Sequence, residues 1–310
     1  MKKSDPSLAV LIPCHNEEST VSSVVSSFRL ALPHAKIYVY DNASTDRTAD
    51  AARKAGAIVR SEPRKGKGNV VRRMFADIDA DIYVLVDGDA TYDASVVPSM
   101  LQKMQEGNLD MVVGVRKAVK AEEAYRPGHV FGNWILSSMV SFIFKCKFSD
   151  MLSGLRVMSR RFIKSVPVLS SGFEIETEIA IHAAQVGASY DEVMTKYDSR
   201  PDGSNSKLNT FKDGFHILWM IIILFKEHKP FVFFSLWFLF FSVSSAILSY
   251  PIFITWSETG LVPRIPTTIL CSGLMILAFL SLACGIILES IGHARLEKKL
   301  TQYLGLPPKT

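Results

Sequence analysis

The chain has 310 residues, 48% of them hydrophobic, and a mean hydropathy of +0.19, with the apolar excess almost entirely toward the C-terminal end. This length allows one large domain or two smaller ones, and a dispersed net charge of +5 argues against a nucleic-acid-binding protein. The four cysteines, Cys14, Cys146, Cys271 and Cys284, form no CxxC pair, so neither a disulfide framework nor a zinc site is predicted.

Short apolar runs alternate with helical patterns through the first 115 residues. Residues 1–7 are polar and lead straight into the first run, so no signal peptide is expected. The patterns predict strands at 8–13, 36–40, 57–60, 82–86 and 109–115, and helices at 19–28, 46–55, 67–76 and 96–106. Strands alternating with helices of about ten to fifteen residues predict a doubly wound, mostly parallel α/β sheet.

The pattern loosens after residue 115. We expect a charged loop over the site at 117–127, an apolar helix at 132–144, a polar cluster within 148–158, a helix at 174–185, a last strand at 190–197 and a polar loop at 198–207. Glu174 and Glu178 share one face of the helix at 174–185, because residues four apart are neighbours on a helix.

Two uncharged apolar segments, 231–253 and 266–288, each exceed the about 20 residues that a membrane span requires. Lysine or arginine flanks their outer ends at Lys226, Lys229, Arg295, Lys298 and Lys299. The positive-inside rule therefore places both termini in the cytoplasm. We separately expect the protein to lie in the inner or plasma membrane of a prokaryote. The less favoured alternative is a pair of buried helices in a soluble protein.

These segments define the expected domains. An α/β domain in the cytoplasm would cover 1–210, an interfacial amphipathic helix and linker 211–230, two transmembrane helices 231–288, and a cytoplasmic tail 289–310. The segment 211–225 is predicted to lie in the membrane interface because it is too short to cross.

Carboxylates follow three of the predicted parallel strands: Glu17 the first, Asp41 the second, and Asp87 and Asp89 the fourth. In open α/β sheets, ligands bind beyond the carboxyl ends of the strands. Gly88 allows a tight turn between two aspartates, which can jointly hold a divalent cation that bridges to phosphates. Asp41 and Glu17 suit the base or ribose of a nucleotide. The sequence thus predicts a metal–diphosphate site, although Asp-Gly-Asp also occurs in ordinary turns.

A basic, glycine-containing loop at 64–69 precedes the helix at 67–76. Backbone amides at a helix N-terminus, together with Lys65 or Lys67, would attract phosphate. The loop lacks the spacing of a P-loop, and a solvated basic loop is the alternative interpretation.

These residues together resemble the family 2 glycosyltransferases of the GT-A fold. The resemblance is carried by Pro13-Cys14-His15-Asn16-Glu17-Glu18, Asp41, Lys65-Gly66-Lys67-Gly68 and Asp87-Gly88-Asp89. It narrows to the polyisoprenyl-phosphate glycosyltransferases, the dolichol- or undecaprenyl-phosphate sugar synthases, through Ser149-Asp150, Ser153-Gly154-Leu155-Arg156, Arg200 with Gly203-Ser204-Asn205-Ser206-Lys207, and the two spans. Asp-Gly-Asp in place of Asp-Ala-Asp, and two spans instead of one or four, leave the sugar open.

The resemblance implies inverting transfer from a nucleotide-sugar to a polyprenyl phosphate, with Mg²⁺ or Mn²⁺ as cofactor. It places the donor at Pro13, Asn16, Glu17, Asp41, Lys65, Gly68, Asp87 and Gly88, the metal at Asp87 and Asp89, the acceptor and its phosphate at Arg156, Glu178, Arg200, Ser206 and Lys207, and catalysis at Asp89 and Asp150. A phosphate monoester, with a second pKa of about 6, is largely anionic at neutral pH. Asp150 is therefore expected to orient the acceptor or a cation rather than to act as a strong base.

Two alternatives stay open: a membrane-anchored family 2 enzyme with another glycan or lipid acceptor, and a non-catalytic scaffold that binds a nucleotide-sugar. A processive polysaccharide synthase is disfavoured because the chain has no Gln-x-x-Arg-Trp motif and only two spans. The sequence does not identify the sugar or the nucleotide, although UDP with glucose or N-acetylglucosamine is favoured. Small residues in the spans would allow packing into a homo-oligomer such as a tetramer; they are Ser242, Ser244, Ser245, Ala246 and Gly273.

Overall fold

The computed structural model describes residues 6–118, 148–172, 174–197, 222–223, 225–262 and 264–306. The chain divides into two compact units, Met1–Gly214 with Lys299–Thr310, and Phe215–Lys298. The helix expected at 132–144, the loop expected at 198–207, Cys146, and most of the segments 117–127 and 211–225 lie outside the described residues.

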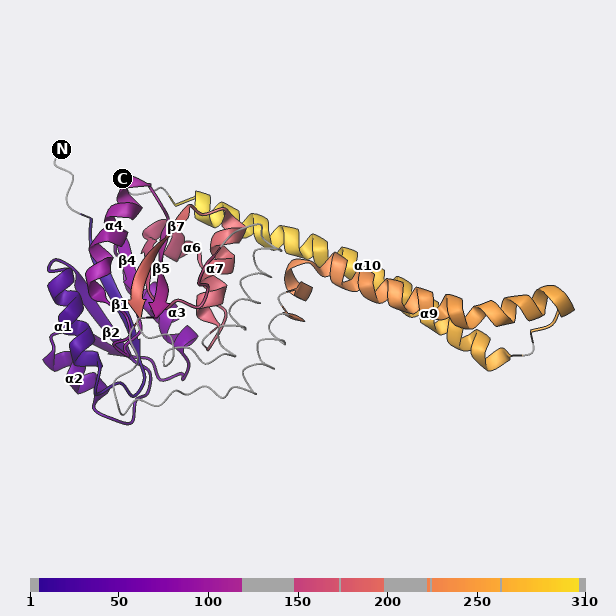
Figure 1. Cartoon of the computed structure of the whole chain (residues 1–310), viewed down its shortest axis with the longest axis horizontal. Coiled ribbons are helices and arrows are strands. Elements are labelled where there is room, and N and C mark those ends of the chain that lie inside the picture. Colours follow the sequence, from indigo (N-terminus) through magenta and orange to yellow (C-terminus); the bar gives the residue numbers. More distant parts are fainter. Residues whose placement is uncertain are drawn as a thin grey trace. The chain divides into compact units, whose positions relative to one another are not determined.

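The first unit contains a seven-stranded sheet in the order β3-β2-β1-β4-β6-β5-β7. Of these strands, Figure 1 labels β1, β2, β4, β5 and β7. Its strands are β1 (Leu8–Cys14), β2 (Lys36–Asp41), β3 (Ile58–Ser61), β4 (Ile82–Leu85), β5 (Met111–Ala118), β6 (Arg156–Ser159) and β7 (Tyr190–Tyr197). All neighbours pair in parallel except β6, which is antiparallel to β4 and β5. The predicted mostly parallel α/β sheet is confirmed, and β6 is an antiparallel strand that the pattern did not reveal.

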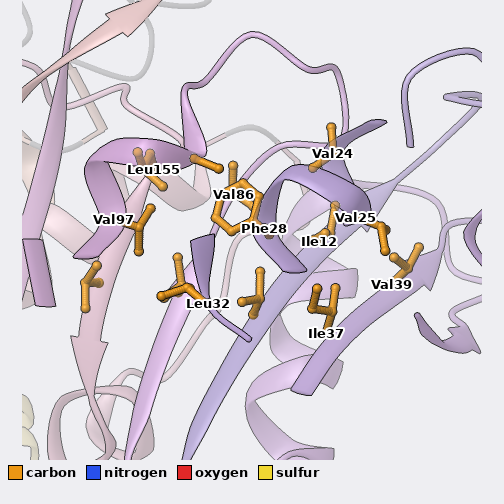
Figure 2. Packing of buried hydrophobic residues seen from close by; sticks show 14 of the residues in the cluster. Ile12, Val24, Val25, Phe28, Leu32, Ile37, Val39, Val86, Val97 and Leu155 are labelled. Carbon is orange, nitrogen blue, oxygen red and sulfur yellow. The ribbon is translucent and has the colours of Figure 1, made fainter. Parts of the chain in front are cut away.

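Helices cover both faces of this sheet. The helices α1 (Val21–Ala31), α2 (Thr48–Lys54) and α4 (Val97–Glu106), with the short 3₁₀ helix η1 (Ala94–Val96), lie on one face, and α3 (Lys67–Asp77), α6 (Arg160–Ser165) and α7 (Ile175–Val186) on the other (Figure 1). Alternation along the strands directs Val10, Ile12, Val84 and Val86 toward the first face, because successive side chains point to opposite sides. Phe28 of α1 packs among them in the core (Figure 2).

His182 on α7 is buried as a neutral group. Its Nε2 lies 2.9 Å from Ser165 Oγ, and its Nδ1 has no hydrogen-bond partner among the described residues. Burial, with a smaller contribution from the positive charge of Lys299, lowers the pKa of His182 to about 4. The pKa of a histidine in an unfolded chain is about 6.5. Between this pKa and that of the folded protein, the unfolded chain therefore binds more protons than the folded chain. Stability is therefore lost as the pH falls through this window.

We expect the free energy of unfolding to fall by about 2 kcal/mol between pH 7 and pH 4.5 through His182 alone. His182→Gln, which cannot titrate, should show a correspondingly weaker pH dependence. The measurement compares unfolding midpoints of the two proteins in the same detergent at both pH values. An identical pH dependence in both would show that His182 does not carry this effect.

The second unit is a pair of long apolar helices, α9 (Pro230–Thr259) and the part of α10 (Ile265–Leu304) that precedes Lys299. Their most apolar windows have mean hydropathies of 2.2 and 2.4 and are only 6% and 17% buried. Length and composition therefore allow both helices to cross a membrane, and their exposure separates them from core helices of a soluble protein. The residues expected to form a tail from 289 onward continue α10 up to Leu304.

Polar contacts join the two apolar helices. Phe231 N donates to Glu289 Oε2 at 3.2 Å, and Ser245 Oγ donates to Cys271 O at 2.9 Å. Ser245, expected to be available for packing between protomers, is thus buried within the chain itself.

Candidate active site

The sheet brings the predicted site residues to one edge. Cys14 at the end of β1 is paired in register with Asp41 at the end of β2, and β4 ends beside them. Because β6 is antiparallel, it begins at this edge, with Arg156 opposite Leu85. The carboxyl ends of β5 and β7 lie at the same edge, since both strands run parallel to β4.

The buried thiol of Cys14 lies beside the predicted carboxylates, because Cys14 pairs in register with Asp41 and a Cβ on Gly88, between Asp87 and Asp89, would lie 2.5 Å from its Sγ. Burial raises the pKa of Cys14 well above its usual value, and the negative charges of Glu17, Asp41, Asp87 and Asp89 raise it further. All four carboxylates therefore lie close enough to interact with one sulfur atom. This concentration of negative charge beside a sheet edge favours the binding of a cation.

Three loops at this edge each hold a non-glycine residue in the left-handed region. The residues are Asn16, Ala43 and Ala90, with φ angles of 54°, 53° and 59°, and they follow β1, β2 and β4. Such conformations cost about 1–2 kcal/mol each and persist only where the surroundings fix them, which is common at ligand sites. Among the described residues, a fourth case, Asn108, lies in the turn before β5.

Asp87 is held by a buried lysine. Lys67, the first residue of α3, forms ion pairs with both Asp87 and Glu176 of α7, and the Lys67 and Glu176 side chains are only 9% and 6% exposed. Burial disfavours the charged ammonium, but the two carboxylates outweigh it and the pKa of Lys67 is raised. Burial raises the pKa of Glu176, and the charge of Lys67 opposes this shift. A cation between two carboxylates thus supports the Asp-Gly-Asp turn.

The turn also depends on two glycines. A Cβ atom on Gly88 would lie 2.5 Å from Cys14 Sγ, and a Cβ on Gly154 would lie 2.2 Å from Asp87 Oδ2. Both positions therefore require close backbone approach, and Gly154 fixes the segment before β6 against Asp87.

We expect Gly154→Ala to reduce enzymatic activity at least about tenfold, because the new methyl group displaces the Asp87 carboxylate. Gly292→Ala on α10, where a Cβ meets nothing within 4 Å, is the matched control and should retain wild-type activity. Initial rates and melting temperatures of both variants should be measured together. A fully active Gly154→Ala protein would show that the position of Asp87 is not critical.

Asp89 is 4% exposed, and its Oδ1 accepts hydrogen bonds from Thr91 Oγ1 at 2.7 Å and Thr91 N at 3.3 Å. Thr20 Oγ1 donates to Gly88 O at 2.7 Å, which ties the loop after β1 to this turn. Among the described residues, no group of three or more His, Cys, Asp or Glu side chains is placed to hold a metal. Two carboxylates nevertheless fit Mg²⁺ or Mn²⁺, because such ions commonly take one or two carboxylates and complete their shell with substrate phosphates and water.

Asp41 offers an unmet hydrogen-bond acceptor. Its Oδ2 accepts from Ser44 N at 3.3 Å, whereas its Oδ1 is buried and has no hydrogen-bond partner among the described residues. Buried polar atoms are almost always satisfied, so this oxygen is suited to a donor group on a ligand. The nearby Asn16 has a structural contact, since its Oδ1 accepts from Thr45 N at 2.8 Å and so joins the loops after β1 and β2.

Asp150 forms a bidentate ion pair with Arg116 near the end of β5, with Nε–Oδ2 and Nη2–Oδ1 distances of 2.6 and 2.7 Å. The Arg116 guanidinium lies 5.4 Å from the ring centroid of Tyr197 at the end of β7. Tyr197 in turn makes an edge contact with Tyr92, whose hydroxyl accepts from Gly154 N at 2.7 Å. Sequence reasoning did not select Arg116, Tyr92 or Tyr197, although Arg116 directly follows the strand predicted at 109–115, Tyr197 ends the strand predicted at 190–197, and Tyr92 follows Asp89 closely.

Arg156 offers an unmet cationic donor. The residue is 1% exposed, its Nε donates to Ser153 O at 3.1 Å, and its Nη2 donates to Met151 O at 2.6 Å. Its Nη1 is buried with no hydrogen-bond partner among the described residues. Burial lowers the pKa of Arg156, and Glu176 and Asp150 oppose that shift. An anionic oxygen is the ligand that fits this donor.

Three predicted contacts differ from the structure. Gly68 N donates to Ser171 O and Gly172 O, both at 3.1 Å, so this amide is already used and does not await a phosphate. Glu178 accepts from Leu169 N at 2.7 Å and therefore holds a loop, whereas Glu176 forms an ion pair with Lys67, which also pairs with Asp87. Lys65 is exposed, and Lys67 takes the interior position.

The remaining predicted site residues are Pro13 and Glu17, which the structure describes, and three residues that it does not. Pro13 is buried within β1 opposite Tyr40, and Glu17 N donates to Thr48 Oγ1 at 2.8 Å. Arg200, Ser206 and Lys207 lie outside the described residues.

The mixed, mostly parallel seven-stranded sheet has a GT-A-like fold. The chain belongs to glycosyl transferase family 2, whose family model matches residues 9–166. Glycosyltransferase AglJ of Haloferax volcanii is 35% identical over 229 residues, covering 74% of this chain and 75% of the relative. A dolichyl-phosphate hexose transferase of the same organism is 29% identical over 208 residues, covering 67% and 89%.

A solved structure shares the fold. Glucosyl-3-phosphoglycerate synthase from Mycobacterium tuberculosis, in complex with Mg²⁺ and uridine diphosphate, superimposes with a TM-score of 0.57 at 22% identity, covering 72% of this chain and 79% of that chain.

Proposed function

We propose that this glycosyltransferase transfers a sugar, with inversion, from a nucleotide-sugar to a polyprenyl phosphate at the cytoplasmic face of a membrane, releasing a nucleoside diphosphate. The observation that carries the proposal is a pair of unmet buried atoms at one sheet edge. Asp41 Oδ1, an acceptor, follows β2, and Arg156 Nη1, a cationic donor, begins β6, with β1 and β4 between them in the sheet. A donor nucleotide and an acceptor phosphate supply the complementary groups.

On the donor side, Asp41 would accept a hydrogen bond from the ribose or the base. Asp87 and Asp89 would hold Mg²⁺ or Mn²⁺, which when bound would stabilise the leaving diphosphate. The ion pair with Lys67 keeps the Asp87 carboxylate in place. The synthase from Mycobacterium tuberculosis, which shares the fold, binds uridine diphosphate with Mg²⁺ and UDP-glucose with Mn²⁺, which supports a UDP-sugar as donor.

On the acceptor side, Arg156 would bind the phosphate, aided by Arg200, Ser206 and Lys207. Asp150 is paired with Arg116 and would orient that cation beside the acceptor. The acceptor oxygen is already largely anionic, so it requires little assistance from a base. A polyprenyl chain would remain in the bilayer that α9 and α10 cross. The relative that is a dolichyl-phosphate hexose transferase supports this acceptor class.

The test uses the full-length protein in detergent with Mg²⁺ or Mn²⁺, undecaprenyl phosphate and a panel of nucleotide-sugars, with mass spectrometry of the lipids. A new lipid mass with one donor would support the proposal and identify the sugar. Nucleotide release without a glycolipid would indicate a different glycan or lipid acceptor. Nucleotide binding without turnover of any donor would indicate a non-catalytic scaffold.

A further inference from the structure

The C-terminal end of α10 is bound to the α/β unit. Tyr303 is 6% exposed, and its hydroxyl donates to Asp110 Oδ2 at 2.5 Å. The Arg161 guanidinium lies 4.6 Å from the centroid of the Tyr303 ring. One turn earlier, Lys299 Nζ donates to Gln185 Oε1 at 2.7 Å. These contacts place Lys299–Thr310 within the same compact unit as the sheet.

Asp110 is the buried carboxylate that accepts the hydrogen bond from Tyr303. It is 2% exposed and accepts from Arg161 Nη2 at 2.7 Å, Ser159 Oγ at 2.9 Å and Ser189 Oγ at 3.2 Å. It therefore links the start of β5 with the end of β6 and the start of β7. A buried carboxylate requires such partners, because an unpaired one is costly, and the Tyr303 hydroxyl is one of them. The contact is specific in both shape and chemistry.

The contact lies at the end of the sheet opposite the candidate active site. Asp110 immediately precedes β5 and Arg116 is near its end, so the two are separated by about 20 Å along the strand. Tyr303 therefore lies away from the candidate active site. The chain passes between the two compact units twice, after Gly214 and again before Lys299. A domain joined by a single linker reorients freely, whereas a second attachment restricts it.

We propose that Tyr303, bound to Asp110, is a positioning residue that holds the α/β unit in the orientation required for an acceptor embedded in the bilayer. This inference rests on the proposed function, because it concerns an acceptor whose chain stays in the membrane. A long-chain acceptor presents its phosphate only at the membrane surface, so it requires an oriented site. A water-soluble, short-chain analogue reaches the same site by diffusion in any orientation.

The experiment uses the full-length protein in lipid vesicles and compares the wild type with Tyr303→Ala, Tyr303→Phe and Gln302→Ala. Gln302 is the exposed neighbour of Tyr303 on the same turn and is the matched control. Hydrogen exchange of the 299–306 amides reports whether the segment is bound. Initial rates are measured with undecaprenyl phosphate and with a short-chain, water-soluble polyprenyl phosphate.

We expect Tyr303→Ala to raise amide exchange about tenfold and to lower the rate with undecaprenyl phosphate about tenfold, because a hydrogen bond to a carboxylate is lost. The short-chain rate should stay unchanged. Tyr303→Phe, which retains the ring over Arg161, should lie between, and Gln302→Ala should match the wild type.

Equal loss with both acceptors would overturn the inference, since Tyr303 would then only support the fold of the α/β unit. An unchanged undecaprenyl rate despite faster exchange would overturn it too. If the wild type itself transfers to neither polyprenyl phosphate, the proposed function fails, and the acceptor-positioning role fails with it. That result is distinguishable because it precedes any substitution.

Discussion

Asp89→Asn is expected to lower the initial rate of sugar transfer by about a thousandfold with metal saturating, whereas Asp150→Asn should retain far more activity. Asp89 and Asp150 are equally buried, each 4% exposed, and both substitutions replace one carboxylate oxygen with an amide nitrogen. The chemical change and the burial are the same in both variants, so the comparison reports what the carboxylate charge does at each of the two positions. At Asp89 the loss of charge would weaken the binding of a cation. The cation would then stabilise the departing diphosphate less well.

The milder effect at Asp150 follows from its partner. Arg116 donates two hydrogen bonds to Asp150, and an asparagine still offers one oxygen to that fork. The measurement is a set of initial rates across a metal titration, with melting temperatures to confirm folding. Asp89→Asn should also need more metal to reach its residual maximum. Equal losses in the two variants would contradict the assignment of Asp150 as an orienting group.

The sheet and the convergence of its carboxylates were predictable because both depend on local patterns. Apolar runs such as 82–86 identify strands, and parallel topology then places the following residues at one edge. The strand pattern and the parallel topology were sufficient to place Asp41, Asp87 and Asp89 at this edge. The strand β6 was not predictable in this way, because it begins with a buried arginine, which masks the apolar signal.

Side-chain direction was the harder inference. Glu176 and Glu178 are two residues apart, which is about 200° around a helix, so only one of them can face the sheet edge. Lys65 and Lys67 also differ in direction: Lys65 lies exposed in a loop, whereas Lys67 begins α3 and its side chain points inward. Which residue of each pair points inward depends on the packing between α3 and α7. A local sequence pattern carries no information about that packing. The pairing of Tyr303 with Asp110 spans 193 residues and is equally invisible to local reasoning.

Lys67→Met is expected to lower the free energy of unfolding by about 3–5 kcal/mol, since it leaves the buried carboxylate of Glu176 and the partly exposed carboxylate of Asp87 without their cation. Lys65→Met is the matched control, because Lys65 is exposed and its replacement should change stability little. Unfolding midpoints of both variants and of the wild type, in one detergent, provide the test. Comparable losses in the two variants would show that the buried ion pairs are not the cause.

A second substitution distinguishes an uncompensated charge from a simple loss of packing. In Lys67→Met/Glu176→Gln the orphaned buried charge is removed as well, so part of the lost stability should return. In Lys67→Met alone, the destabilisation should shrink as the pH falls, because burial already raises the pKa of Glu176 and protonation removes its charge. The double variant lacks that group and should not show this recovery. If the double variant is as unstable as the single one at every pH, then lost packing around the lysine stem, and not charge, explains the effect.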